Sequence, residues 1–278
     1  MYKITRKEVL NPTVSLMEIE APLIAEKAEP GQFIILRTDE NGERIPLTVA
    51  GFDRKKGTVT IIFQVAGATT ESLNHMKEGD SLHDFVGPLG RSTKTEGKKK
   101  VAIVGGGVGC AIALPIVKKF HEQGTEVHTV IGFRSKDLVI LEDEFKANSS
   151  KLVLMSDDGS CGEKGLVTDA LRKLIDSGEK YDEVITIGPL IMMKFVSKLT
   201  KEYGIKTVAS MNPIMIDGTG MCGGCRLSVG GKTKFACVEG PEFDAHEIDF
   251  DEAIARSSMY KPFERKAHEE VCKLLQIR

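Results

Sequence analysis

The sequence lacks an excess of charge of either sign, because 38 Lys and Arg stand against 40 Asp and Glu for a formal net charge of -2. A protein that binds nucleic acid neutralises phosphates with basic side chains, and no basic excess is present for that purpose. Long apolar runs are missing as well. The runs at residues 101–104 and 214–216 are far shorter than the roughly 20 residues that a membrane-spanning helix needs. The sequence therefore predicts no nucleic-acid partner and no membrane span.

The first ten residues have no apolar stretch of the kind found in secretory leaders, so we expect a cytoplasmic protein. In such a compartment, six cysteines are more typical of metal ligands, redox groups or packed side chains than of a disulfide framework. Three of them stand alone, and we interpret Cys110, Cys161 and Cys272 as ordinary packed residues. The other three fall within 16 positions near the C-terminus.

A chain of 278 residues is long enough for two domains, or for two domains and a small appendage. Residues 1–97 alternate polar and apolar side chains in short runs such as residues 58–65, and the turn-forming pairs Pro30-Gly31 and Asn41-Gly42 interrupt them. This pattern predicts an antiparallel sheet or barrel. A charged stretch at residues 94–100 follows, and we place the first domain boundary between residues 97 and 98.

Residues 98–209 follow a different rhythm, in which short buried strands alternate with glycine turns and longer amphipathic segments. We expect strands at residues 101–104, 126–131, 151–155, 183–187 and 206–209, and helices at residues 109–120, 166–175 and 190–203. Such alternation predicts a parallel sheet covered by helices. Residues 210–278 begin rich in glycine and cysteine and then turn polar and helical. A segment this small would gain stability from a bound metal.

Four residues of this last segment have the spacing of an iron–sulfur site. Asp217, Cys222, Cys225 and Cys237 follow the pattern D-x4-C-x2-C-x11-C, and plant-type [2Fe-2S] sites use C-x4-C-x2-C with a more distant fourth cysteine. Glycines at positions 218, 220, 223 and 224 let the backbone wrap tightly and turn its N–H groups toward sulfur. We therefore predict a [2Fe-2S] cluster with Asp217 in the first ligand position. A zinc site with the same four ligands is the alternative.

An aspartate ligand replaces one thiolate with a harder, less electron-donating oxygen that keeps the negative charge. We hypothesise that this exchange raises the potential of the cluster above that of a four-cysteine site. The rise should be smaller than the one that neutral histidine ligands produce in Rieske-type centres.

Three glycine turns follow predicted strands of the second segment. The turn Gly105-Gly106-Gly107-Val-Gly109 comes between a buried strand and a helix, where bare backbone and a helix N-terminus suit a pyrophosphate. The other two turns contain Asp157-Asp158-Gly-Ser and Gly188-Pro189. Ligands of open parallel sheets bind at the carboxyl ends of the strands, so we expect all three turns to line one dinucleotide crevice. For Gly188-Pro189 a simple helix start is the alternative.

Asp157 and Asp158 are candidates for contact with the adenosine ribose of the dinucleotide. A 2′-phosphate at that place would be repelled by roughly 4 kcal/mol per close unit pair at intermediate dielectric, before solvent screening. The sequence therefore predicts a preference for NAD(H) over NADP(H), with solvated turn carboxylates as the alternative.

The first segment carries four motifs: Gly31-Gln-Phe33, Arg44-Ile-Pro46-Leu47-Thr48, Phe63-Gln64-Val65-Ala-Gly-Ala-Thr69-Thr70 and Gly87-Pro-Leu-Gly90. The GGGVG turn, Gly132-Phe-Arg134-Ser135, the DDGS turn and Gly188-Pro189 follow them. In this order the motifs resemble the ferredoxin-NADP reductase superfamily over nearly the whole chain. Ser210-Met-Asn212-Pro213 and the aspartate-first cluster motif narrow the resemblance to one branch. That branch holds the electron-transfer subunits of dihydroorotate dehydrogenase and the small subunits of NADH-dependent reduced ferredoxin:NADP oxidoreductase, an electron-bifurcating transhydrogenase.

The resemblance implies FAD in the first segment and NAD(H) in the second, where Arg134 lies in a shared motif. It places Pro46, Leu47 and Thr48 beside the isoalloxazine ring and ribityl chain, and Gln64, Val65, Thr69 and Thr70 near ring and phosphates. Arg44 is the candidate pyrophosphate clamp, and it stands four places before Thr48 where the family has arginine three places before. Ile187 occupies the place of a cysteine that relatives often have.

The resemblance also implies how electrons move. Nicotinamide stacked on the flavin exchanges a hydride and the flavin passes single electrons to or from the cluster, so we expect no essential side-chain acid or base. The implied partner is a larger flavoprotein subunit with [4Fe-4S] clusters, which divides the electrons of NADPH between ferredoxin and this chain. Residues 250–278 are a candidate docking element or a plain surface helix. The alternatives are an electron-transfer subunit of dihydroorotate dehydrogenase or sulfide dehydrogenase, and a non-redox zinc-knuckle module.

Overall fold

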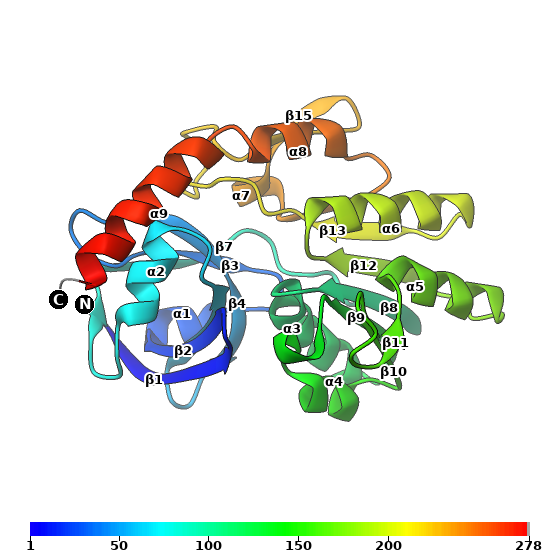
Figure 1. Cartoon of the computed structure of the whole chain (residues 1–278). Coiled ribbons are helices and arrows are strands. Elements are labelled where there is room, and N and C mark those ends of the chain that lie inside the picture. The colour runs from blue at the N-terminus through cyan, green and yellow to red at the C-terminus, as the bar shows by residue number, and fades with distance from the viewer. Residues whose placement is uncertain (277–278) are drawn as a thin grey trace.

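The computed structural model describes residues 1–276 and consists of two seven-stranded sheets with a C-terminal segment that reaches across both (Figure 1). The predicted fold class is confirmed: an antiparallel barrel comes first, a parallel α/β sheet follows, and a small module ends the chain. Within the described residues, no helix is long and apolar enough to cross a bilayer.

The first sheet is a nearly closed antiparallel barrel with the strand order β6-β1-β2-β5-β4-β3-β7. Its strands are β1 (Tyr2–Asn11), β2 (Val14–Glu20), β3 (Phe33–Arg37), β4 (Ile45–Asp53), β5 (Thr58–Gln64), β6 (Ser81–Leu82) and β7 (Asp84–Leu89). Successive side chains of a strand point to opposite faces, so Met17 and Ile19 are fully buried while Glu20 is exposed. The helices α1 (Pro22–Lys27) and α2 (Ala68–His75) add Ile24 and Leu73 to the same core.

The second sheet has the strand order β11-β10-β9-β8-β12-β13-β16, and all of its pairings are parallel except that of β16 with β13. Its strands are β8 (Lys100–Gly106), β9 (Glu126–Phe133), β10 (Lys151–Ser156), β11 (Glu163–Lys164), β12 (Glu183–Ile187), β13 (Thr207–Ser210) and β16 (Glu242–Asp244). The five predicted strands are present. The two short edge strands β11 and β16 carry too few apolar residues to have been expected.

Helices cover both faces of this sheet, as the run of buried residues in β8 requires. Val101 and Ile103 pack against one set of helices, whereas Ala102 and Val104 pack against the other. The first set consists of α3 (Gly109–Glu122) and α4 (Glu142–Asn148), which follows the short 3-10 helix η1 (Lys136–Leu138). The second set consists of α5 (Val167–Asp176) and α6 (Leu190–Glu202).

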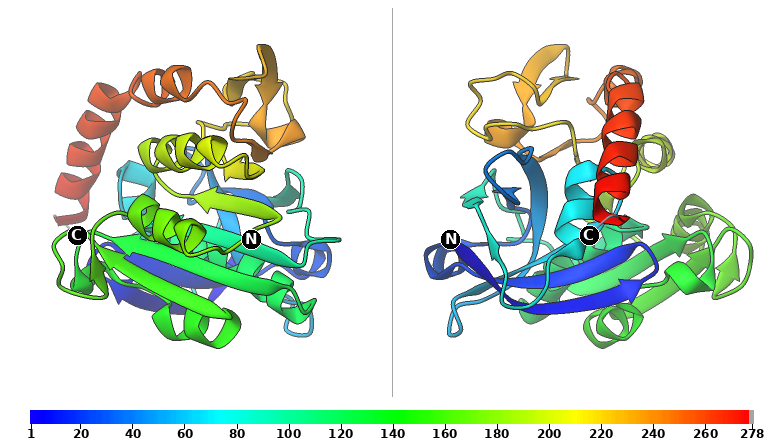
Figure 2. Two further views of the ribbon diagram at one scale, coloured as in Figure 1. Left: turned by 90° about the vertical axis from the view of Figure 1, so that its right-hand side faces the viewer. Right: turned by 60° about the vertical axis from the view of Figure 1, so that its left-hand side comes forward.

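The C-terminal segment contacts both sheets. It contains β14 (Arg226–Val229), β15 (Lys232–Phe235), α7 (Ala236–Glu239), α8 (Phe250–Ser257) and α9 (Lys261–Gln276), besides β16 of the second sheet. Helix α9 lies along α2 of the barrel in both views of Figure 2. The tail predicted at residues 250–278 thus forms two helices, and its last two positions, 277 and 278, lie outside the described residues.

Candidate functional site

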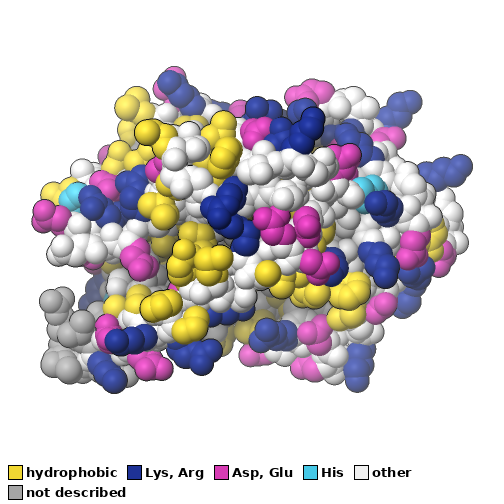
Figure 3. Space-filling model, turned by 90° about the horizontal axis from the view of Figure 1, so that it is seen from above, with side chains coloured by type: hydrophobic (Ala, Val, Ile, Leu, Met, Phe, Trp, Pro, Cys, Tyr) yellow, Lys and Arg dark blue, Asp and Glu magenta, His cyan; other side chains and the backbone are white. Residues whose placement is uncertain are grey.

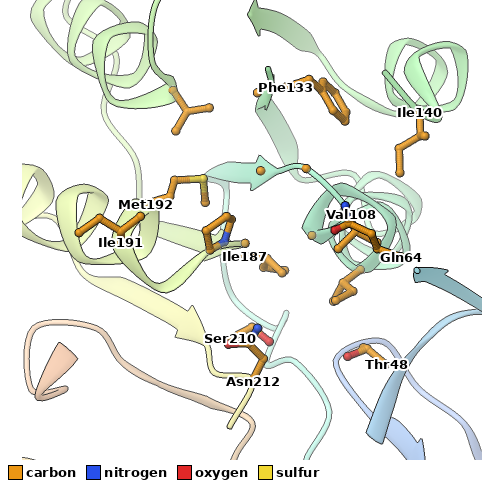
Figure 4. Close-up of a pocket in the computed structure, with 18 of the residues that line it drawn as sticks. Thr48, Gln64, Val108, Phe133, Ile140, Ile187, Ile191, Met192, Ser210 and Asn212 are labelled. Atoms are coloured by element: carbon orange, nitrogen blue, oxygen red, sulfur yellow. The ribbon is translucent and has the colours of Figure 1, made fainter. Parts of the chain in front are cut away.

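A cleft of about 900 Å³ separates the barrel from the second sheet. Figure 4 shows Thr48 and Gln64 of the barrel and Val108 of the glycine turn on the right, Met192 of α6 on the left, and Asn212, which follows β13, below. The carboxyl ends of β8, β9 and β12 all open into this cleft. This is the edge at which open parallel sheets bind their ligands.

The glycine turn after β8 is shaped for close approach of a ligand. Gly107 has a φ of 55° and nothing within 4 Å of the position of a Cβ atom, so its backbone faces open space. Gly109 is packed tightly instead, because a Cβ atom there would lie 2.5 Å from the carbonyl oxygen of Ile187. The turn therefore needs glycine at one place for exposure and at another for packing of α3 against β12.

Two helices direct their N-termini at the cleft. Helix α3 begins at Gly109, directly after the turn, and α6 begins at Leu190, directly after Gly188-Pro189. Neither helix has an acidic residue in its first turn, so the positive ends of both helix dipoles remain uncompensated. The site consequently suits an anionic group such as a dinucleotide pyrophosphate.

The two aspartates predicted to meet the ribose have different positions. Asp157 lines the cleft together with Arg134. Asp158 does not line it, and its Oδ1 accepts hydrogen bonds from the Ser160 hydroxyl at 2.6 Å and the Ser160 backbone N–H at 2.9 Å. These hydrogen bonds hold the pKa of the Asp158 carboxyl below its ordinary value. The structure therefore presents Asp157 to the cleft and uses Asp158 to shape the turn.

The predicted flavin residues also divide into two groups. Pro46, Thr48 and Gln64 line the cleft. Leu47 and Val65 pack against the barrel core instead. Leu47 alternates with Pro46 and Thr48 along β4, and Val65 directly follows Gln64 at the end of β5.

Thr69 and Thr70 begin helix α2, outside the wall of the cleft. Thr69 donates a hydrogen bond to Glu43 at 3.1 Å, and the Thr70 hydroxyl accepts the backbone N–H groups of Ala66 and Gly67 at 3.0 Å. Both hydroxyls therefore order the start of the helix.

Arg44 contacts residues 211–225, the loop between β13 and β14 that carries three of the predicted metal ligands, and does not line the cleft. We call this segment the cluster loop. The Nε of Arg44 donates a hydrogen bond to the carbonyl oxygen of Ile216 at 2.8 Å, and its Nη1 lies 3.6 Å from Asp84. Arg256 of α8 donates to the carbonyl oxygen of Gly224 at 3.3 Å from the other direction. Two arginines, one from the barrel and one from the C-terminal helices, thus hold the backbone of the loop that carries the predicted metal ligands.

The predicted metal ligands gather on that loop and on α7. The Sγ atoms of Cys225 and Cys237 lie 3.2 Å apart, and both residues are buried. Burial together with the neighbouring thiol raises the pKa of Cys237 to about 12. A buried thiolate pair is unfavourable without a compensating cation, so the pair fits a bound metal. Asp217 accepts backbone N–H groups of Thr219, Met221 and Cys222 at 3.0–3.1 Å.

The donor atoms of the four predicted ligands are not gathered around one point. Across residues 1–276, the donor atoms that form a three-ligand group within 4.8 Å of one another do not include Asp217 or any of its three cysteines. A tetrahedral zinc ion would hold its sulfur ligands about 3.8 Å apart, since each Zn–S bond is about 2.3 Å. One close cysteine pair with two more distant ligands fits a centre with two metal ions better than a zinc knuckle.

The cluster loop and the cleft share one apolar core. Met215 lines the cleft and packs in the same group of buried residues as Cys225 and Cys237. Phe33 of β3 also lines the cleft and packs in this group of buried residues, from the barrel side. The cluster loop lies close to the same strand, because a Cβ atom at Gly218 would lie 2.7 Å from the Ile35 side chain. Cys225 and Cys237 therefore belong to a buried core that also forms part of the wall of the cleft.

Comparison with known proteins agrees with this geometry. Residues 212–249 match the iron–sulfur cluster binding domain of dihydroorotate dehydrogenase B, and residues 103–198 match the oxidoreductase NAD-binding domain. A Thermotoga maritima protein described as a dihydroorotate dehydrogenase B (NAD(+)) electron transfer subunit homolog is 45% identical over 98% of this chain and 96% of its own. The corresponding Desulforamulus reducens electron transfer subunit is 32% identical over 88% of this chain and 96% of its own.

The chain belongs to the family of dihydroorotate dehydrogenase B electron-transfer subunits.

A solved structure from this family gives the same fold. It is described as "Insights into flavin-based electron bifurcation via the NADH-dependent reduced ferredoxin-NADP oxidoreductase structure" and is 44% identical, with a TM-score of 0.92 and coverage of 97% of each chain. More distant structures, such as the ferredoxin reductase of carbazole 1,9a-dioxygenase at 15% identity and a TM-score of 0.63, share the fold alone. The family confirms a flavin-dependent NAD(P)H oxidoreductase with an iron–sulfur cluster, FAD and NAD(H) as cofactors.

The sequence interpretation did not assign several residues of this electron-transfer subunit to the cleft. They come from the first hairpin, the end of β13 and the cis-proline turn before β16: Asn11, Thr13, Ser210, Asn212, Met215 and Pro241. The motif Ser210-Met-Asn212-Pro213 was a signal for the residues after β13, because it leads from a predicted strand end into the segment with the predicted metal ligands. Asn11 and Thr13 had no signal, since only barrel closure brings them to the cleft.

Proposed function

We propose that this chain is the NAD(H)-side subunit of an electron-bifurcating complex that uses NADH, NADPH and ferredoxin. In that role it passes electrons between a [2Fe-2S] cluster, FAD and NAD(H). The observation that carries the proposal is the shared core of Met215, Phe33 and the buried pair Cys225 and Cys237. Through this core, a cluster held by Cys225 and Cys237 would adjoin the cleft in which we propose that the flavin and the dinucleotide bind.

We assign the groups to residues as follows. Pro46, Thr48 and Gln64 would contact the flavin from the barrel side. Leu47 and Val65 would support these residues from within the barrel core. Arg44 would order the cluster loop, and Thr69 and Thr70 would order the start of α2. The dinucleotide would be held by Gly105, Gly106, Gly107, Gly109, Gly188, Pro189, Arg134 and Asp157. Asp158 would shape the turn that carries Asp157. When bound, these cofactors supply hydride and single-electron transfer. The protein orients them and keeps water out.

Within the cleft, the described lining residues with ionisable side chains are Arg134, directly after β9, and Asp157, directly after β10. Both follow strands of the second sheet, whereas Thr48 and Gln64, which we assign to the flavin ring, belong to the barrel. We propose that no side chain acts as acid or base, because a hydride carries its proton and two electrons together.

For the cluster we propose two ligand pairs. Cys225 and Cys237 would hold one iron, since their Sγ atoms are already 3.2 Å apart. Asp217 and Cys222 would hold the other, and a hydrogen bond from the Cys222 backbone N–H to Oδ2 of Asp217 at 3.0 Å keeps these two residues together. The first iron would be buried and the second would face the surface, because Cys222 is exposed.

The names of the relatives describe a subunit, so a larger partner chain is implied. We propose a flavoprotein with [4Fe-4S] clusters as that partner, which would take electrons from NADPH and reduce ferredoxin. Exposed apolar side chains lie on the cluster loop and on α7, with Ile216 at 52%, Met221 at 88% and Val238 at 44% exposure. Figure 3 shows the upper side of the molecule, where hydrophobic side chains gather in patches between charged ones. Such patches mark interaction sites.

Purification under anaerobic conditions tests the cofactors. We expect flavin and iron–sulfur absorbance, about two irons and two sulfides per chain, and bleaching by NADH. Protein that contains zinc instead of iron, or no flavin, contradicts the proposal.

Affinity purification from the native organism tests the partner. We expect a flavoprotein with [4Fe-4S] clusters and NADPH-dependent ferredoxin reduction. The second candidate is an electron-transfer subunit of dihydroorotate dehydrogenase, which the 32% identical relative favours. Recovery of a dihydroorotate-oxidising partner would decide for that candidate.

A further inference from the structure

A second group of metal-ligating side chains lies where the C-terminal helix crosses the barrel. Glu71 comes from α2, and His268 and Cys272 come from α9. One carboxylate oxygen, one imidazole nitrogen and the thiol sulfur all lie within 4.8 Å of one another. His268 Nε2 is 3.4 Å from Oε2 of Glu71, although the two residues are 197 positions apart in the sequence.

The two helices present these groups by ordinary helix geometry. His268 and Cys272 are four residues apart, so they occupy the same face of α9 one turn from each other. Glu71 and His75 are related in the same way on α2, and His75 Nδ1 lies 3.5 Å from the other carboxylate oxygen of Glu71. Figures 1 and 2 show the two helices side by side.

The surroundings of Glu71 are unusual for a carboxylate at a helix contact. Its side chain is only 19% exposed. In residues 1–276, its ion-pair partners within 4 Å are the imidazoles of His75 and His268, with no lysine or arginine among them. A half-buried carboxylate that faces imidazole and thiol groups without a fixed cation has the environment of a metal ligand.

We propose that Glu71, His268 and Cys272 bind one divalent zinc-class metal ion, with water as its fourth ligand. Oxygen, nitrogen and thiolate sulfur together suit zinc, whereas calcium and magnesium require oxygen ligands. A tetrahedral zinc ion holds such ligands about 3.3–3.8 Å apart, given bonds of about 2.0–2.3 Å. Donor atoms within 4.8 Å of one another meet this requirement after small side-chain adjustments. Cys272 then has a role that its isolated place in the sequence did not indicate.

The metal joins two parts of the chain that serve different cofactors. Helix α2 starts at Ala68, next to the threonines assigned to the flavin side, and α9 follows the cluster module through α8. A metal bound between them fixes the C-terminal helix on the barrel. The site lies apart from Asp217 and its cysteines, so it is independent of the iron–sulfur centre.

The test uses the full-length holoprotein with its flavin and cluster in place. The protein is equilibrated with zinc chloride, passed through a desalting column and analysed for zinc, iron and flavin. We expect one zinc ion per chain with iron and flavin unchanged. X-ray absorption spectroscopy at the zinc edge should find one sulfur neighbour at about 2.3 Å from the zinc ion and nitrogen or oxygen neighbours at about 2.0 Å.

Single variants identify the ligands. Glu71→Gln, His268→Ala and Cys272→Ser should each weaken zinc binding at least tenfold while iron and flavin contents stay at the wild-type level. Glu269→Gln is the matched control, because Glu269 is the exposed neighbour of His268 on the same helix and should leave zinc binding unchanged. His268→Gln serves in addition, should the alanine variant prove unstable.

Hydrogen exchange supplies a structural readout that does not depend on activity. Zinc should slow amide exchange of α9 in the wild type and in Glu269→Gln, but not in His268→Ala. Several results overturn the proposal: no zinc retained, zinc without a sulfur neighbour, zinc gained only with loss of iron, or equal zinc binding in all variants.

Discussion

The Sγ atoms of Cys225 and Cys237 lie 3.2 Å apart at the bottom of the cluster loop, although the two residues are twelve positions apart in the sequence. The antiparallel hairpin of β14 and β15 brings them together, because Cys225 directly precedes β14 and Cys237 follows β15, so both lie at the open end of the hairpin. The two thiols share the core that also forms one wall of the cleft. This contact links the predicted iron site to the predicted flavin site.

Cys225→Ser and Cys237→Ser should each remove the cluster. Serine cannot replace a buried thiolate ligand without strain, so the iron content should fall below about one tenth of the wild-type value while FAD stays bound. Iron analysis and visible spectroscopy measure this outcome. Cys161→Ser is the control, since Cys161 lies outside the cluster loop, in the turn between β10 and β11. Full iron content in the Cys237→Ser protein would show that this residue is not a ligand.

Asp217→Cys should lower the midpoint potential of the cluster. A thiolate donates more electron density than a carboxylate of the same charge and therefore stabilises the oxidised irons. A redox titration followed by electron paramagnetic resonance gives the midpoint. An unchanged or higher midpoint potential would contradict ligation by Asp217. Asp251→Asn, at an exposed position of α8, is the control for a change of surface charge and should leave the midpoint potential unchanged.

Asp157→Asn should raise kcat/KM with NADPH relative to NADH. Asp157 lines the cleft, and removal of its charge relieves repulsion of a 2′-phosphate by about 1 kcal/mol or more. Steady-state reduction of an artificial electron acceptor measures both substrates. Asp143→Asn should leave the ratio unchanged, because the Asp143 side chain is 97% exposed on α4. Equal use of NADH and NADPH by the wild type would remove the basis of the prediction.

Glu242→Gln should stabilise the protein above pH 7. Burial, with a smaller contribution from the charge of nearby Glu183, raises the pKa of Glu242 to about 7, although the hydrogen bond that the Thr93 hydroxyl donates at 2.5 Å and the charge of Lys98 oppose the shift. The folded state therefore holds a proton that the unfolded state releases near pH 4.5, so stability is full below about pH 4.5 and declines as the pH rises to about 7. Part of Glu242 reaches solvent, so we expect the free energy of unfolding to fall by about 1–3 kcal/mol between pH 4.5 and pH 7.

Denaturant unfolding at several pH values measures this loss, and Glu242→Gln should abolish the part of the slope between pH 4.5 and 7. Glu247→Gln, at an exposed position of the same segment, should keep the wild-type profile. Identical profiles for wild type and Glu242→Gln would mean that Glu242 is charged in the folded protein at neutral pH.

The sequence by itself determined the features that depend on near neighbours. Strand alternation in residues 1–97, the glycine turn at 105–109 and the spacing of Asp217, Cys222 and Cys225 are local patterns, because a few consecutive dihedral angles fix them. The alternation and the glycine turn predicted their elements correctly, whereas the ligand set of the cluster stays a prediction. The same rule of alternation could have separated Leu47 and Val65, which point into the barrel, from Thr48 and Gln64, which line the cleft.

Only the tertiary structure decided what distant segments do to one another. Arg44 binds the carbonyl oxygen of Ile216, 172 positions away, and thereby supports the cluster loop instead of lining the cleft. Glu71 meets His268 only because α9 returns to the barrel, and Met215 joins cleft and cluster only because both sheets press against it. Spacing along the chain cannot encode these contacts, since they depend on the packing of whole elements that bury their apolar faces against each other.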